Sequence, residues 1–385
     1  MLGLVVNPIA GIGGPAGLAG SDGADVQALA QERGGAARAS ARAALALEAV
    51  PPGTAVLTAA GAMGADAAGA AGLDPTVVYS PASSAAAGPD APPSTPADTT
   101  AAVRALVEAG ATLVLFAGGD GTARDVAAGL DGASELAALG IPAGVKMYSP
   151  VFAVSPRAAG AVAAAWVDGG LPLQEREVLD VDEAALRRAR VEPVLYATMR
   201  VPYRAGRTQA RKSATPATEH AAVVAAARAA ASALRPGVRY LLGPGGTMSE
   251  VARAIGIDKT PLGVDVVLDG RIVRRGASER ELLDEIGRGP AKAVVSVIGG
   301  QGFLLGRGNQ QLSPRVLRGL GPDPLVVVAP ESKLIELQGR PLLVDTGDAV
   351  ADAAIDGFVR VITGPAASSF YPVHAPELTE EPHAS

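Results

Sequence analysis

The feature of this sequence that most restricts its fold is an apolar run that ends in a glycine-rich turn. Thr112–Ala117 has the composition of a buried strand, Gly118-Gly119-Asp120-Gly121-Thr122 follows at once, and a helical pattern at Ala123–Leu130 begins directly after it. A strand, a tight glycine turn and a helix in this order are typical of a βα unit in a parallel sheet covered on both faces. The sequence therefore predicts an α/β fold built around this unit.

The same alternation of short apolar runs and helical patterns extends over about the first 170 residues. Asp98 or Thr99 is expected to cap a helix that ends at Glu108, and Ser80–Thr95 has the composition of a surface loop. Because strands joined through helices form right-handed crossovers, residues 1–170 are predicted to be a domain with a doubly wound parallel sheet. The other strands are expected at Leu2–Val6, Ala55–Thr58 and Thr76–Tyr79, and the other helices at Ala24–Glu32, Ala36–Ala49, Met63–Gly72 and Pro156–Val167.

The rest of the chain is richer in strands, and we expect a second, α+β domain over residues 171–370 and a tail at 371–385. Ala217–Ala233 is expected to be an alanine-rich helix, and Asp269-Gly270 to be the two-residue turn of a hairpin. Regular structure is expected to fade from Ala366 onward. Strands are expected at Glu175–Val181, Val194–Val201, Gly263–Leu268, Arg271–Val273, Ala291–Ile298, Leu325–Ala329, Pro341–Asp345 and Phe358–Thr363.

Composition excludes several classes of protein. The absence of cysteine excludes disulfides, thiolate metal sites and a cysteine nucleophile, and three histidines do not suggest a histidine-rich metal centre. A net charge of −6 argues against a nucleic-acid-binding surface, and no apolar run reaches the ~20 residues of a membrane span. The start of the chain lacks the basic flank of a signal peptide. We therefore expect a cytoplasmic enzyme or binding protein with small-molecule partners, not nucleic acid or membrane.

The glycine turn has the residue types that a phosphate site needs. Its three glycines let the backbone approach an anion closely, the amides of the following helix would face that anion, and Thr122 adds a hydroxyl donor. Asp120 would take the proton from an acceptor hydroxyl or hold Mg²⁺ that bridges phosphates, and either role fits phosphoryl transfer. The competing interpretation is a plain turn with a helix-capping aspartate. The position at the carboxyl end of a strand, where α/β sheets bind ligands, favours the phosphate site.

The residues of this turn resemble the Gly-Gly-Asp-Gly-Thr signature shared by NAD kinases, diacylglycerol and sphingosine kinases and, more distantly, phosphofructokinases. Asn7-Pro8 with Gly11 is similar to the Asn-Pro-x-x-Gly turn of the same superfamily. Further stretches narrow the resemblance to the ATP-NAD kinase-like proteins, whose relatives include an acetoin-catabolism protein. The matching stretches are Asn7–Gly14, Phe116–Val126, Gly140–Ala153, Leu241–Thr247, Gly299–Pro314 and Val344–Asp348.

The resemblance implies a nucleotide-binding α/β domain, a strand-rich second domain and substrates bound between them. ATP with Mg²⁺, or polyphosphate in some relatives, would phosphorylate the adenosine 2′-hydroxyl of NAD to give NADP. Asp120 would engage the acceptor ribose. The nucleotide loop would consist of Gly118, Gly119, Gly121 and Thr122. The family also implies a homo-oligomer.

The chain departs from the family pattern at three places. The downstream Asn-Glu or Asn-Asp pair has no clear counterpart, and the Thr-Gly-Ser-Thr-Ala-Tyr segment is matched only loosely by Gly243–Met248. Close relatives carry a lysine in the amino-terminal glycine loop where this chain has Ala19. Two alternatives therefore stay open: a kinase of the same superfamily acting on another small hydroxyl substrate, and a non-catalytic nucleotide-binding regulator.

Other positions are candidates for the same ligands. Asn7 is expected to contact the nucleotide, and Lys146 to neutralise a phosphate, unless it is a solvated surface lysine. A second strand–glycine–helix segment supplies Gly245, Gly246 and Thr247 as further nucleotide contacts, with a plain turn as the alternative.

The loop Gly299–Pro314 is rich in amide side chains suited to the edge of a base, and its arginine suits a phosphate. The alternative is a structural loop that satisfies its own backbone, and such a loop would need fewer polar groups. Asp345 and Asp348 follow a later apolar strand, where they would position Mg²⁺ or a ribose; for Asp348, helix capping is the alternative. The substrate-binding candidates of this part of the chain are Gln301, Arg307, Asn309, Gln310, Asp345 and Asp348.

Overall fold

The computed structural model describes residues 1–18, 24–81, 94–131, 133, 135–144, 147–180, 194–204, 207, 220–298 and 301–376. The chain divides into two compact units. The first consists of Met1–Ile12 and Ala36–Arg211, and the second of Gly13–Gly35 and Lys212–Ser385. Each unit is built on one sheet, and the predicted α/β fold class is confirmed.

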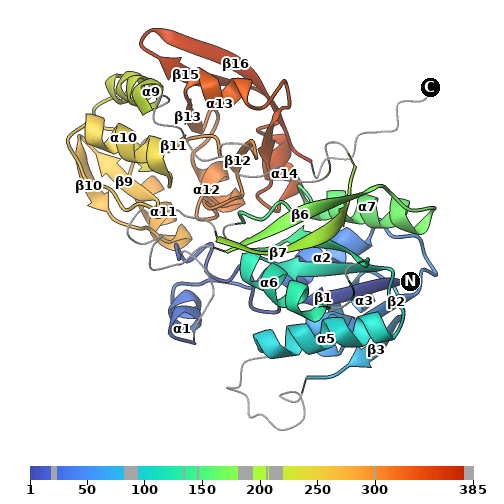
Figure 1. Ribbon diagram of the computed structural model, residues 1–385. Helices are drawn as coiled ribbons and strands as arrows, with labels where there is room; N and C mark the ends of the chain where they lie inside the picture. The colour runs from blue at the N-terminus through green and yellow to red at the C-terminus, as the bar shows by residue number, and fades with distance from the viewer. Residues whose placement is uncertain are drawn as a thin grey trace. The chain divides into compact units, whose positions relative to one another are not determined.

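The first unit contains seven strands within its described residues. They are β1 (Leu2–Val6), β2 (Val56–Ala59), β3 (Pro75–Tyr79), β4 (Leu113–Gly118), β5 (Ala137–Pro142), β6 (Leu173–Asp180) and β7 (Val194–Pro202). Their order in the sheet is β3-β2-β1-β4-β5-β7-β6. Figure 1 labels β1, β2, β3, β6 and β7 of this sheet. Every neighbouring pair is parallel except β6 with β7, so a mainly parallel sheet ends in one antiparallel edge strand.

Helices cover both faces of this sheet. They are α2 (Ala39–Leu47), α3 (Ala65–Ala70), α5 (Pro96–Glu108), α6 (Asp120–Gly129) and α7 (Pro156–Val167), with a 3-10 turn, η1 (Gly61–Met63). α2 packs against α3 and α7, whereas α5 packs against α6. Because β2 and β3 lie on one side of β1 and β4 and β5 on the other, right-handed crossovers place these two groups of helices on opposite faces.

The second unit contains nine strands within its described residues. They are β8 (Arg239–Leu242), β9 (Asp265–Leu268), β10 (Arg271–Arg274), β11 (Ala291–Val295), β12 (Phe303–Leu305), β13 (Leu325–Val328), β14 (Leu342–Val344), β15 (Gly357–Gly364) and β16 (Ala367–His374). Their order is β10-β9-β8-β11-β13-β15-β16-β14-β12. β8, β11, β13 and β15 run parallel to one another, and β16, β14 and β12 run in the opposite direction.

Both faces of the second sheet carry an apolar core. One core contains Met248 and Val294, and the other contains Leu282 and Val295. Because successive residues of a strand point to opposite faces, the helix that carries Met248 covers one face and the helix that carries Leu282 covers the other. The helices of this unit are α1 (Ala24–Glu32), α9 (His220–Ser232), α10 (Gly246–Ala254), α11 (Glu279–Ile286), α12 (Pro314–Gly319), α13 (Glu331–Ile335) and α14 (Ala349–Ala353).

The compact units and the strands of the structure differ at two places from the limits expected for the domains. The first unit extends to Arg211 rather than to residue 170, because β6 and β7 form a hairpin and β7 pairs with β5. The chain does not lose regular structure at Ala366, because β16 pairs with both β15 and β14, so the expected tail begins inside a strand. Residues 377–385 lie outside the described residues.

Two helix starts also differ from the sequence-based expectation. α6 begins at Asp120 rather than at Ala123, so the last three residues of the glycine turn form the first turn of the helix. α5 is capped by Thr95, whose side chain accepts from the amide of Asp98, while the Asp98 carboxylate accepts from the amide of Thr95. Asp98 is therefore the third helical residue of a capping box and not the cap itself. Most of the expected loop Ser80–Thr95 lies outside the described residues.

Candidate nucleotide-binding site

The topology of the first sheet places one edge where α/β sheets bind ligands. The chain leaves β1 toward β2 and β3 on one side, and later returns to form β4 and β5 on the other side. Adjacent loops at the carboxyl ends of β1 and β4 therefore diverge to opposite faces, and this switch point is the usual ligand crevice of a doubly wound sheet. The residues that leave β1 and β4 there are Asn7 and the first glycine turn, Gly118–Thr122.

The first glycine turn is built for close backbone contact. A Cβ on Gly118 would overlap the side chain of Thr122, and a Cβ on Gly144 would lie 2.6 Å from the Cα of Gly119. The Gly118 carbonyl accepts from the amides of Ala143 and Gly144. These hydrogen bonds hold the ends of β4 and β5 together through their backbones. The amides of Gly121 and Thr122 belong to the first turn of α6, where amides have no partner within the helix.

Asn7 joins the end of β1 to this turn. Its Nδ2 donates to Thr122 Oγ1 over 3.0 Å, and its Oδ1 accepts from the amide of Ile9 at 3.3 Å. A few residues on, Gly11 has a φ of 85°, and a Cβ there would approach the carbonyl oxygen of Ala143 to 2.5 Å. The structure thus brings two of the predicted site residues, Asn7 and Thr122, together.

Asp120 is buried, with 9% of its surface exposed, and it is not the cap of α6, because Gly119 occupies that position. Its carboxylate accepts from the amide of Tyr148 at 2.6 Å and from the amide of Ser149 at 3.0 Å. A carboxylate has about four acceptor sites, so these two amides do not by themselves saturate it. The bonds fix the orientation of Asp120 and tie the first glycine turn to the segment after β5.

The residues that hold Asp120 are themselves fixed from the interior. Ser149 Oγ accepts from the amide of Leu179 at 2.9 Å and donates to its carbonyl at 3.0 Å, which connects the segment to β6. Burial, and then the negative charge of Asp120, raise the pKa of Tyr148 to about 12. Tyr148 therefore remains a neutral phenol at physiological pH.

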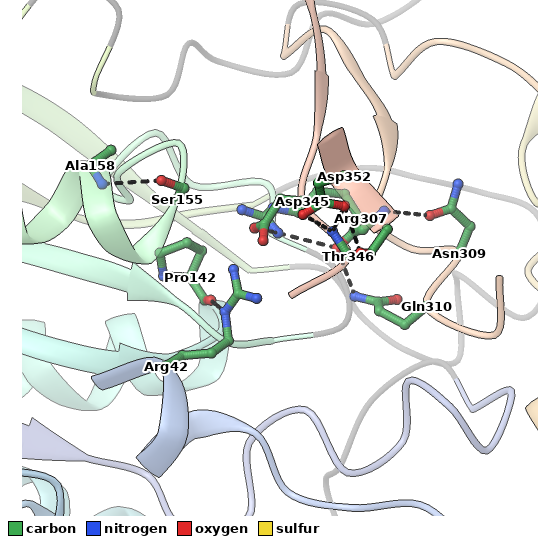
Figure 2. A network of polar contacts seen from close by, with 11 residues as sticks. Arg42, Pro142, Ser155, Ala158, Arg307, Asn309, Gln310, Asp345, Thr346 and Asp352 are labelled. Carbon is green, nitrogen blue, oxygen red and sulfur yellow. Dashed lines mark hydrogen bonds and ion pairs between the residues drawn. The ribbon is translucent and has the colours of Figure 1, made fainter. Parts of the chain in front are cut away.

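Sequence reasoning missed a buried arginine beside this site. Arg42 of α2 is 8% exposed, and its Nε donates to the carbonyl of Pro142, the last residue of β5 (Figure 2). The next two residues, Ala143 and Gly144, are the ones that donate to the Gly118 carbonyl. The signal for this contact was weak, because Arg42 lies in an alanine-rich helix 100 residues from its partner. Lys146, the cation that the sequence did suggest, lies outside the described residues, as does Ala19.

The second glycine turn, Gly243–Thr247, lies in the second unit. Gly245 has a φ of 102° and caps α10, and Gly246 is the first residue of that helix. Thr247 is buried, and its Oγ1 accepts from the ammonium group of Lys333 over 3.2 Å. The predicted strand–glycine–helix arrangement is therefore present, with a lysine that the sequence did not connect to it.

The candidates of the loop after β12 form a buried network in the second unit (Figure 2). Arg307 donates to Asp345 Oδ2 over 2.7 Å, and its guanidinium lies 4.3 Å from the ring centroid of Phe303. Asn309 Oδ1 accepts from the amide of Gly306, while its Nδ2 donates to the carbonyl of Leu304. Asn309 thus binds the backbone of its own loop, a structural role that the composition of the loop had not favoured.

Gln310, Gln301 and Asp348 are the remaining candidates of the second unit. Gln310 Nε2 donates to the Gly306 carbonyl at 3.3 Å, and Gln301 is buried. Asp348 caps α14 by accepting from the amide of Ala351, and it also pairs with Arg318. The hydrogen bond from Ala351 and the pairing with Arg318 hold the pKa of Asp348 below its usual range. Helix capping, the alternative stated for Asp348, is therefore present.

Comparison with protein families supports this reading of the fold. Residues 2–171 match the ATP-NAD kinase N-terminal domain, and residues 235–373 match the ATP-NAD kinase C-terminal domain. The chain belongs to the ATP-NAD kinase family. Family membership supports a transferase of the kinase type that acts on small molecules, with ATP and NAD as the substrates that the family name implies.

No curated protein and no solved structure matches the chain significantly. Within the described ranges, no helix is long and apolar enough to cross a membrane. Nor do these residues contain a group of three or more histidine, cysteine, aspartate or glutamate side chains arranged to hold a metal ion. Mg²⁺ in phosphoryl transfer is commonly held by one or two carboxylates together with the substrate phosphates, and such a site needs no cluster of this size.

Proposed function

We propose that this member of the ATP-NAD kinase family transfers the terminal phosphate of ATP to a ribose hydroxyl of NAD, giving NADP. The observation that carries the proposal is the hydrogen bond between Asn7 and Thr122 at the switch point of the first sheet. It holds a polar side chain from β1 against the first turn of α6, where backbone amides favour an anion. The phosphate-binding residues are Asn7, Gly118, Gly119, Gly121 and Thr122.

Asp120 is the proposed acidic residue of the reaction. Its carboxylate is held in one orientation by two amides, and a fixed group loses less freedom when the acceptor hydroxyl arrives. In the reaction the hydroxyl oxygen attacks the terminal phosphorus, the bond between that phosphorus and the bridging oxygen breaks, and ADP leaves. Asp120 would accept the proton of the hydroxyl as the new bond forms.

Mg²⁺ is the cofactor that ATP chemistry implies, and the first glycine turn offers one carboxylate that could bind it. Asp120 is the carboxylate of this turn, so the protein would supply one ligand and the phosphates and waters the others. When bound, the ion would neutralise charge on the transferring phosphate. Asp120 as proton acceptor and Asp120 as metal ligand are alternatives that the experiment below separates by the dependence of nucleotide binding on Mg²⁺.

The second candidate function is nucleotide binding without turnover. It is favoured by the engagement of Asp120 with Tyr148 and Ser149, since a carboxylate used to fix a loop has a structural reason to be there. Phosphorylation of another small alcohol remains the third candidate, because the chain lacks a clear match to the family's acceptor-binding pair. A cytoplasmic location stays an expectation drawn from the composition, and a homo-oligomeric state stays an expectation drawn from the resemblance.

The test is NADP formation by the purified full chain with ATP, Mg²⁺ and NAD. We expect wild type to produce NADP and Asp120→Asn to lose at least about 100-fold in kcat, the usual contribution of a general base. Asp66→Asn is the matched control, an exposed acid in the first turn of α3. Binding of ATP with and without Mg²⁺ is measured for each variant. Asparagine keeps one acceptor oxygen, so the loop has a better chance to stay folded than with alanine.

The three candidates give different results. Release of ADP only with another alcohol contradicts NAD as the acceptor. Tight ATP binding without turnover on any acceptor supports the non-catalytic function. If ATP binding by Asp120→Asn loses its dependence on Mg²⁺, Asp120 is a metal ligand, and if only kcat falls, it is the proton acceptor.

A further inference from the structure

Three polar residues follow adjacent strands at one edge of the parallel part of the second sheet. β8, β11 and β13 are adjacent and parallel, with β11 in the middle. Thr247 follows β8, Ser296 is the first residue after β11, and Lys333 follows β13. The carboxyl ends of adjacent parallel strands lie at the same edge of a sheet, so these three residues share that edge.

The hydrogen bond between Lys333 and Thr247 spans the end of β11. Lys333 Nζ donates to Thr247 Oγ1 over 3.2 Å, although the strands before these two residues are separated by β11 in the sheet. The lysine therefore reaches over the middle strand to the second glycine turn. The ammonium group of Lys333 thus lies at the start of α10, where the amides and the dipole of the helix favour an anion.

Ser296 lies on the face of the sheet that α10 covers. Val295 and Val297 belong to the core on the opposite face, whereas Val294 packs in the same core as Met248 of α10. Because side chains alternate between faces, Ser296 points with Val294 toward the α10 layer. Its Oγ is buried and has no hydrogen-bond partner among the described residues. A buried hydroxyl without a partner costs free energy, so its retention calls for a ligand.

The turn itself leaves room for a ligand. Gly245 and Gly246 are both exposed, and a Cβ on either would meet nothing within 4 Å. At Gly118 of the first unit, neighbouring atoms leave no space for a Cβ, but at Gly245 and Gly246 they do. Lack of space for a side chain therefore does not explain the glycines of the second turn. They expose the first amides of α10, and Gly245 takes a φ of 102° that a side chain would disfavour.

We propose that Thr247, Ser296 and Lys333 form an anion site in the second unit that binds a phosphate group. Lys333 supplies the charge, Ser296 donates its hydroxyl hydrogen, and the amides of Gly246 and Thr247 complete the cradle. The site consists of residues of the second unit alone. It rests on the proposed function only in the expectation that the phosphate belongs to a nucleotide; the binding of phosphate does not depend on catalysis.

The probe is inorganic triphosphate, titrated into the full chain by calorimetry without any acceptor. We expect Lys333→Met to weaken one binding component by tenfold or more and Ser296→Ala to weaken it about threefold to tenfold. Thr122→Val, a change in the first unit, leaves this component unchanged. Lys292→Met is the matched control, because Lys292 is a lysine of the same unit that pairs with the exposed Asp323. Thermal unfolding is recorded for each variant.

Ser296→Ala separates a ligand-binding role from a structural one. Because the Ser296 hydroxyl has no hydrogen-bond partner among the described residues, its removal should leave Tm unchanged or raise it while triphosphate binding weakens. A lower Tm with unchanged binding overturns the proposal, and so does equal affinity in wild type and Lys333→Met. If wild type forms NADP but Lys333→Met binds triphosphate normally, this proposal fails and the kinase stands. If Lys333→Met loses triphosphate binding while wild type forms no NADP, the anion site stands and the kinase proposal fails.

Discussion

Asn7 and Thr122, 115 residues apart in the sequence, are joined by a hydrogen bond of 3.0 Å between Nδ2 and Oγ1. The bond connects the end of β1 to the first turn of α6, across the point at which the strand order of the sheet reverses. The hydrogen bond thus connects the loops that follow β1 and β4, although these loops continue toward opposite faces of the sheet. The position of both residues is set by the neighbouring parallel strands β1 and β4 and not by local sequence.

Replacing Thr122 tests this connection. Thr122→Val keeps the shape of the side chain but removes the hydroxyl, leaving Asn7 Nδ2 without its partner, so we expect the affinity for ATP to fall about tenfold, the effect of one hydrogen bond of ~1.4 kcal/mol. Thr122→Ser, which keeps the hydroxyl, should restore most of that affinity. Thr112→Val is the control, because Thr112 lies at the opposite end of β4 and bonds to Met1. Equal ATP affinity in Thr122→Val and Thr112→Val would contradict a role for the hydroxyl.

Arg42 is expected to contribute to stability through the carbonyl of Pro142. Arg42→Met leaves that buried carbonyl without its donor, which costs about 1–3 kcal/mol of unfolding free energy in urea denaturation. Arg42→Lys keeps the charge but not the fixed geometry of the guanidinium, so its loss should be intermediate. Arg104→Met is the control, since Arg104 also donates to a backbone carbonyl but is exposed, and it should change stability by less than about 0.5 kcal/mol. Similar losses in Arg42→Met and Arg104→Met would disprove this role.

The ion pair of Arg307 and Asp345 should behave as a buried pair. Either Arg307→Met or Asp345→Leu leaves one buried charge without its partner, at a cost of about 3–5 kcal/mol of unfolding free energy. The double variant should lose much less than the sum, because no uncompensated charge remains. The exposed pair of Lys292 and Asp323 is the comparison, with an expected coupling of about 0–1 kcal/mol. Additive losses at Arg307 and Asp345 would show that the two charges do not stabilise each other.

Lys259 should make stability depend on pH in the alkaline range. Burial lowers the pKa of Lys259 to about 8 from 10.5, although Asp265 opposes the shift. Between about pH 8 and 10.5 the unfolded chain therefore holds a proton that the folded chain has lost. Stability rises with pH wherever the unfolded state binds more protons, so this group adds up to about 1.4 kcal/mol per pH unit in that window.

The measurement compares wild type with Lys259→Met by urea denaturation at pH 7.5, 8.5 and 9.5. The variant loses the bonds from Nζ to the carbonyls of Thr260 and Gly263, together with the cost of burying the charge. Only wild type gains stability from the titration, so its unfolding free energy minus that of the variant should rise with pH. The range stops below pH 10 because burial raises the pKa of Tyr148 to about 12, and this group lowers stability as pH rises from 10 to 12. A difference that stays constant with pH would rule out titration of Lys259.

Sequence patterns predicted those elements of the fold whose limits are set by residues adjacent in the sequence. The apolar run Leu2–Val6 and the helix Pro156–Val167 have the predicted limits, because each is bounded by turn or capping residues. Asp269 and Gly270 have φ values of 49° and 73°, as the two-residue hairpin turn requires. The first glycine turn was found for the same reason, since its strand, glycines and helix are contiguous.

Contacts between distant residues could not be read from the sequence. Lys333 lies 86 residues from Thr247, and no periodicity or spacing connects the two. β16 was missed because its polar residues Ser368 and Ser369 weaken the strand pattern, whereas pairing with β15 stabilises it. The amide-rich loop after β12 had the composition of a ligand site, and only the structure reveals that Asn309 binds its own backbone.

The central claim is that backbone amides of the first glycine turn hold the phosphates of a nucleotide. Backbone amide NMR of the isotope-labelled full chain, recorded with and without ATP, tests it most directly. We predict that the largest chemical-shift changes fall on the amides of Gly119, Gly121 and Thr122, and that inorganic triphosphate reproduces them. Amides of the first glycine turn that stay unchanged while saturating ATP shifts resonances elsewhere would contradict the account.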